Sequence, residues 1–169
     1  PYTFGRWWLG EDRGLKANNN YSKQIKDLKD FFDISKANMD VENSMNLKSK
    51  AMKPIFDGLT TVYLYADDEK EIVDGVTFLK GFGIDKIVIV GATESKNQLS
   101  FIKENNIPVI VKQPYRFPQS VDSDPMETFL IAKKMLDAGI LVSIDPTGTA
   151  SARVSIRNLP FYAGSFSSF

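Results

Sequence analysis

Carboxylate side chains follow three of the four short β-rich segments in the second part of the chain. Asp67 comes two residues after Tyr65, Glu94 follows the next β-rich segment, and Asp145 follows the last one. Such a set could bind a hard cation or transfer protons as general acid and base. Asp67 and Glu94 are also typical of residues at helix starts, where the helix dipole favours negative charge. Both interpretations stay open, and all four residues are candidates for the site.

The segment Tyr115-Arg-Phe-Pro118 places two aromatic residues around an arginine, after the third β-rich segment. Arg116 could hold a carboxylate through two parallel N–H bonds, and Tyr115 could stack or hydrogen-bond beside it. The alternative is that Arg116 pairs with the nearby Asp122 or Asp124. Tyr115 and Arg116 are therefore candidate binding residues.

A loop at residues 91–95 follows one β-rich segment and precedes a helical pattern, which is the right context for a phosphate at a helix N-terminus. It has neither the further glycines of a dinucleotide-binding loop nor the Gly-Lys-Ser/Thr of a P-loop. An ordinary connecting loop is the favoured interpretation, and a phosphorylated ligand is the lesser alternative.

Composition excludes several classes of protein. The chain has 169 residues, 21 basic and 21 acidic side chains, and neither Cys nor His. Balanced charge gives no field that attracts nucleic acid, so we expect no such partner. The missing residues exclude disulfides, a Ser-His-Asp triad and His-built metal sites. No apolar run approaches the roughly 20 residues of a membrane span.

Hydrophobic patterning changes near residue 58 and predicts two regions. Residues 1–58 read as an N-terminal arm with a helical insertion, whereas residues 59–169 alternate short strands with helices. This alternation predicts an α/β fold with a parallel sheet, either doubly wound or part of a barrel, and ligands then collect at the carboxyl ends of the strands. The predicted strands are residues 61–65, 86–90, 108–112 and 140–144. Apolar spacing predicts helices over residues 21–34 and 45–56, and residues 157–165 could begin a last helix. Asp68 with Glu71 predicts a capping box at one helix start, and Asp124 predicts the N-cap of another. Since the chain begins at Pro1 without Met, we interpret it as a fragment.

Several stretches from about residue 45 onward carry a resemblance in their order and spacing: Leu47-Lys-Ser-Lys-Ala-Met-Lys-Pro-Ile-Phe-Asp-Gly58, Val62-Tyr-Leu-Tyr-Ala-Asp-Asp-Glu-Lys-Glu-Ile72, Phe82-Gly-Ile-Asp-Lys-Ile-Val-Ile-Val-Gly91, Asn106-Ile-Pro-Val-Ile110, Tyr115-Arg-Phe-Pro118 and Arg157-Asn-Leu-Pro-Phe-Tyr-Ala-Gly164. They resemble the middle of imidazolonepropionase-like members of the amidohydrolase superfamily. The resemblance implies a parallel βα repeat that forms part of a TIM-like (β/α)8 barrel, incomplete in this chain.

That family implies metal-assisted hydrolysis of C–N bonds, in which one or two zinc-like divalent ions polarise a carbonyl and activate water. An Asp after the last barrel strand takes the proton, and Asp145 lies near that place, so it is the candidate catalytic residue. Tyr65 and Tyr115 stand where the family carries His ligands. A phenol must lose a proton of pKa about 10 to bind such an ion, so we expect no metal cofactor in this chain.

The resemblance therefore implies a fragment of an amidohydrolase-like protein that is not a competent hydrolase by itself. The alternative is a non-catalytic ligand-binding or scaffold module, with a pocket lined by Tyr65, Asp67, Tyr115, Arg116 and Asp145. Its expected partners are the remainder of its own barrel or another subunit, and its expected ligand is a small amide or peptide-like molecule. The compartment does not follow from these residues, although relatives of this kind are often exported.

Overall fold

The computed structural model describes residues 2–4, 15–17, 19–39, 46–112, 126–145 and 156–168. The chain divides into two compact units, Pro1–Pro54 and Ile55–Phe169. Among the described residues, no helix combines the length and apolar character needed to cross a membrane.

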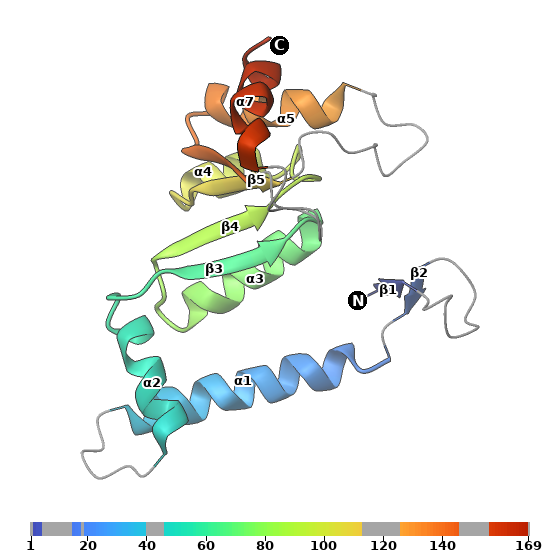
Figure 1. Ribbon diagram of the computed structural model, residues 1–169. Coiled ribbons are helices and arrows are strands. Elements are labelled where there is room, and N and C mark those ends of the chain that lie inside the picture. The colour runs from blue at the N-terminus through green and yellow to red at the C-terminus, as the bar shows by residue number, and fades with distance from the viewer. Residues whose placement is uncertain are drawn as a thin grey trace. The chain divides into compact units, whose positions relative to one another are not determined.

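The first unit contains a short hairpin and a long helix. Strands β1 (Tyr2–Phe4) and β2 (Leu15–Ala17) pair antiparallel. The hairpin was not predicted, because strands of three residues are too short to show a clear period in the sequence. Helix α1 (Tyr21–Asn38) was predicted from its three- and four-residue spacing of apolar side chains, and it runs four residues beyond the predicted end at Ile34. Helix α2 (Leu47–Phe56), also predicted, begins in this unit (Figure 1).

The second unit is built on a parallel sheet of four strands in the order β3-β4-β5-β6. The α/β fold predicted from the alternating pattern is therefore confirmed. Because sequence neighbours are also sheet neighbours, the reversal that defines a doubly wound sheet does not occur within these strands. The strands are β3 (Val62–Ala66), β4 (Ile87–Gly91), β5 (Val109–Lys112) and β6 (Val142–Asp145).

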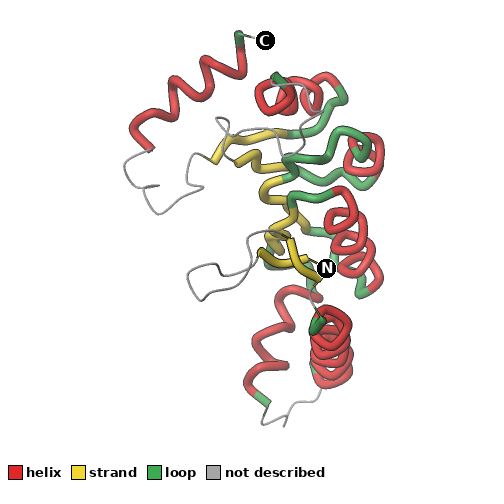
Figure 2. The backbone as a smooth tube through the Cα atoms, turned by 90° about the vertical axis from the view of Figure 1, so that its right-hand side faces the viewer, coloured by secondary structure: helices red, strands yellow, loops and turns green. Residues whose placement is uncertain are grey.

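Helices α3 (Glu69–Gly81), α4 (Leu99–Glu104) and α5 (Glu127–Asp137) connect the strands and lie on one side of the sheet (Figure 2). The core between these two layers is almost entirely aliphatic: Ile72, Val76, Ile89, Ile102, Val109, Val111, Ile131 and Met135 are each no more than 2% exposed. Burial of this apolar surface is what holds the helices on the strands.

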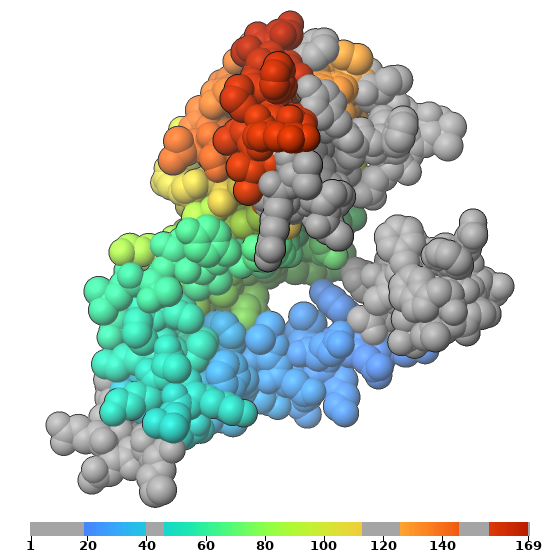
Figure 3. All heavy atoms as spheres, in the orientation of Figure 1, coloured from blue at the N-terminus to red at the C-terminus, as the bar shows by residue number. Residues whose placement is uncertain are grey.

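The last described part of the chain is a short 3₁₀ turn, η2 (Ile156–Asn158), followed by helix α7 (Leu159–Ser167). Helix α7 packs on α5, and it is the red segment at the top of Figure 3. Phe166 of α7 is buried. The sequence predicted a last helix over residues 157–165, and each end of α7 lies two residues further along the chain.

Candidate functional site

The two faces of the sheet differ in what covers them. Leu64 packs against α3 so closely that a Cβ added to Gly75 would lie 2.8 Å from Leu64 Cδ2. Alternation along a strand therefore turns Tyr63 and Tyr65 to the opposite face, where they are 56% and 70% exposed. We call this opposite side of the sheet the open face.

The strand register extends the open face across the sheet. Tyr65 is paired with Val90, Val90 with Ile110, and Ile110 with Ser143. One layer further toward the carboxyl ends, Lys112 of β5 is paired with Asp145 of β6. The middle of the open face therefore carries uncharged side chains, whereas its carboxyl edge carries the cation of Lys112 and the carboxylate of Asp145. This is the edge at which α/β sheets bind ligands.

Lys112 is a residue of this edge that the sequence analysis missed. Its ammonium nitrogen lies 4.3 Å from the centroid of the Tyr65 ring, which is cation–π geometry. Lys112 was not among the predicted site residues, because those were sought after each strand and Lys112 is the last residue within β5. The signal that could have found it is its position two residues after Ile110, on the same face of the strand.

Asp67 joins two loops at the carboxyl edge. Its Oδ1 atom accepts a 2.8 Å hydrogen bond from Thr93 Oγ1, and its backbone oxygen accepts one of 3.0 Å from the N–H of Glu94. The loop passes so close that a Cβ added to Gly91, which has φ +116°, would lie 2.5 Å from Asp67 Oδ1. Asp67 therefore holds the β3–α3 and β4–α4 loops together, whatever it binds in addition.

The start of α3 confirms one predicted feature and corrects another. Asp68 is the N-cap, and its Oδ1 atom accepts a 2.8 Å hydrogen bond from the backbone N–H of Lys70. Glu71, expected to complete a capping box with Asp68, instead accepts a 3.4 Å bond from the N–H of Asp67. The carboxylate reaches one residue further back than the predicted box requires.

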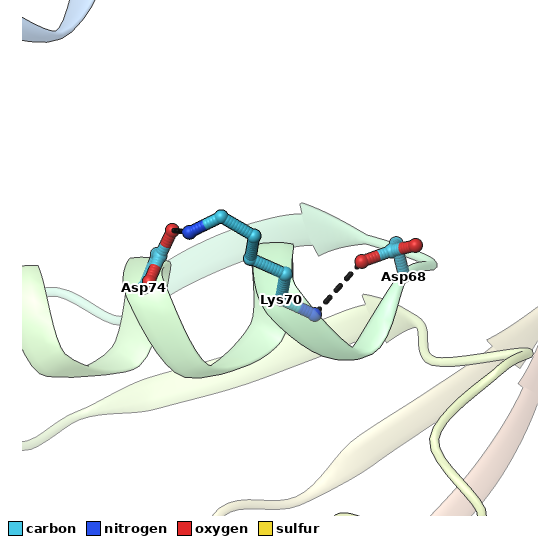
Figure 4. A network of polar contacts seen from close by, with 3 residues as sticks. All are labelled: Asp68, Lys70 and Asp74. Atoms are coloured by element: carbon cyan, nitrogen blue, oxygen red, sulfur yellow. Dashed lines mark hydrogen bonds and ion pairs between the residues drawn. The ribbon is translucent and has the colours of Figure 1, made fainter. Parts of the chain in front are cut away.

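An open hollow of about 650 Å³ lies beside this helix start and contains several carboxylates. Asp68 caps the helix, Lys70 Nζ pairs with Asp74 at 2.6 Å (Figure 4), and Glu69 accepts a 2.7 Å bond from Asn97. These acidic groups already serve helix capping and surface pairing. The hollow is lined by Asp68, Glu69, Lys70, Val73, Asp74, Glu94 and Gln98.

A further ion pair connects the β4–α4 loop to α5. Lys96 Nζ lies 3.1 Å from Glu127 Oε1. The hydrogen bond and charge of Glu127 raise the pKa of Lys96 above its ordinary value. Glu127 is the first residue of α5, where a negative charge also favours the helix dipole.

The predicted site residues are brought together only in part. Tyr65 and Asp145 lie at the open face, whereas Asp67 and Glu94 lie in adjoining loops. Tyr115 and Arg116 lie outside the described residues, as does Asp124, the predicted start of α5. Among the residues that the structure describes, no cluster of three His, Cys, Asp or Glu side chains could hold a metal ion. The donor set described here does not fit the divalent ion that the family resemblance implies.

Together these elements define a parallel α/β module with the strand order of part of a barrel. A solved structure with a similar fold is an amidohydrolase from Thermotoga maritima MSB8, with a TM-score of 0.62 and 17% sequence identity. The similarity covers 88% of this chain and 38% of that chain, so this chain spans well under half of its neighbour. At this identity the likeness establishes a shared fold. No protein-family model and no curated protein matches the chain.

Proposed function

We propose that this chain is part of an amidohydrolase-like barrel, and that its carboxyl edge binds a small amide or peptide-like ligand. The observation that carries the proposal is the fold shared with an amidohydrolase over most of this chain. The sequence stretches that resemble the imidazolonepropionase-like group support the same descent independently. The exposed Tyr65 and the half-buried Asp145 lie at the carboxyl edge, which is the right place for a ligand.

We further propose that these residues bind without metal-dependent hydrolysis. The chain contains no His, and phenols at positions 65 and 115 are poor ligands for a zinc-like ion. Asp145 stays the candidate for proton transfer, should groups beyond this chain complete a catalytic centre. The second candidate function is therefore hydrolysis by a larger assembly, favoured by the position of Asp145 at the end of β6.

We propose that the partner of this chain is a set of further barrel strands. Within the described part of the chain, β3 and β6 are the two edges of the sheet, and four strands are too few to close a barrel. Further strands would come from the remainder of the same barrel or from another subunit. Export stays a prediction from the family resemblance.

The test is a calorimetric titration of zinc into this chain and into the double variant Tyr65→His, Tyr115→His. If the tyrosines replace lost ligands, the unmodified chain binds no stoichiometric zinc and the double variant gains affinity. A matched control is Tyr63→His, which places an imidazole on the same face of β3 but further from the carboxyl edge. Stoichiometric zinc binding by the unmodified chain, or equal gains in the control and the double variant, would overturn the proposal of a lost metal site.

A further inference from the structure

Lys112 differs from other lysines of the second unit in what its ammonium group contacts. Several surface lysines have oxygen partners, as in the pairs Lys70–Asp74, Lys80–Asp85, Lys96–Glu127 and Lys133–Asp137. In the part of the chain that the structure describes, the contact of Lys112 Nζ is the Tyr65 ring, and no oxygen acceptor is bound to it. Its hydrogen-bonding capacity is therefore available.

The aromatic ring fixes the ammonium without using its donors. A ring attracts a cation through its quadrupole, and the N–H groups that point away from the ring still need acceptors. Lys112 lies on β5 and Tyr65 on β3, so the contact between their side chains spans the strand between them, β4. Asp145, the register partner of Lys112, lies on the other neighbouring strand, β6.

The ammonium group makes this a site for negative charge. Val90 on β4 is the register partner of both Tyr65 and Ile110. Val90 is 4% exposed, and Ile110 is half-buried. Tyr65 is 70% exposed, so water reaches this contact. A hydrogen bond from an ammonium to an oxygen anion is nevertheless stronger than one from a neutral donor. Two described carboxylates of this edge oppose an anion: Asp67, which is hydrogen-bonded to Thr93, and Asp145, which lies on the strand beyond β5.

We infer that Lys112, positioned by Tyr65, binds a carboxylate group of the ligand at the carboxyl edge. This inference rests on the proposed function and narrows its ligand class from small amides in general to peptide-like molecules with a free carboxylate. Lys112 is the binding residue, and Tyr65 is the positioning residue that holds its ammonium over β4.

The test compares two probes of the same size, N-acetylglycine and N-acetylglycinamide, titrated into the isotope-labelled chain and followed by NMR. Only the first carries a carboxylate. We expect both to shift signals at the carboxyl edge, with N-acetylglycine bound more tightly. Lys112→Met keeps the aliphatic stem and removes the charge, so it should lower the affinity for N-acetylglycine by about tenfold or more and abolish the preference. The control Lys86→Met removes an exposed lysine just before β4, at the opposite edge, and should change neither affinity.

Tyr65 provides a second, independent variant at an exposed position, where loss of folding is not a concern. Tyr65→Phe keeps the ring and should retain the preference for N-acetylglycine, whereas Tyr65→Leu should lose most of it. If both probes bind the edge equally, or the preference survives Lys112→Met, the inference is overturned while the proposed ligand site stands. If neither probe shifts signals at the edge, the inference and the proposed ligand site fail together. The zinc titration is a separate experiment, and it tests only whether Tyr65 and Tyr115 replace lost metal ligands.

Discussion

Replacing Gly91 with alanine should destabilise the folded chain, because Gly91 lies at the tightest contact between the two loops of the carboxyl edge. Gly91 ends β4 with φ +116°, where an added Cβ would lie 2.5 Å from Asp67 Oδ1 and 2.9 Å from the backbone oxygen of Ala66. The backbone conformation alone costs an L-residue roughly 1–3 kcal/mol. Moving the Asp67 side chain also breaks its hydrogen bond with Thr93, which contributes about 1 kcal/mol. We expect a total loss of about 3 kcal/mol in the free energy of unfolding.

The assay is urea denaturation followed by circular dichroism, with thermal melting as a second readout. For a chain of 169 residues, a loss of this size corresponds to a melting temperature lower by about 6–12 °C. Gly81→Ala is the matched control, because an added Cβ there meets nothing within 4 Å. The control should stay within about 0.5 kcal/mol of the unmodified chain. A Gly91→Ala variant as stable as the control would refute the close approach of the two loops.

Two further predictions concern buried and paired groups. Thr128 in α5 has a buried hydroxyl without a hydrogen-bond partner among the described residues, so Thr128→Val should raise the free energy of unfolding by about 1 kcal/mol in urea denaturation. The control Thr77→Val, at an exposed position, should not raise it. A Thr128→Val variant less stable than the unmodified chain would show that the hydroxyl is bonded. Glu127 raises the pKa of Lys96 in the folded state, so the stability from this pair is present below the unfolded pKa of Lys96 and is lost as pH rises through the higher folded value. Lys96→Met should therefore be less stable than the unmodified chain at about pH 8 and equal to it at about pH 12, and a difference that persists at high pH would contradict the pairing.

The fold was largely predictable because its signals are local. The β-branched run in β4 and the helical stripe of Ile72 and Val76 identify a strand and a helix on sequence alone. Alternation of the two types then predicts a parallel sheet. The β1–β2 hairpin could not be found in this way, since each strand is only three residues long and the pairing joins residues more than ten positions apart.

The candidate site was less predictable because it depends on register. That Tyr65 and Asp145 share one face follows only once the pairing of four strands is known. The contact of Lys112 with Tyr65 spans 47 positions in the sequence and two steps across the sheet, and no local pattern encodes it. Asp67 was recognised as a strand-end carboxylate, but its bond with Thr93 depends on the tight passage at Gly91.

The central proposal is that the carboxyl edge of this chain binds a ligand without hydrolysing it. The most direct measurement is an NMR time course of the chain with N-acetylglycinamide in the presence of added zinc. We predict shifts at the carboxyl edge, including residues near Tyr65 and Asp145, and no release of acetate, glycine or ammonia above the rate in buffer. Release of a hydrolysis product that is lost in Asp145→Asn would contradict the claim and establish this chain as a hydrolase.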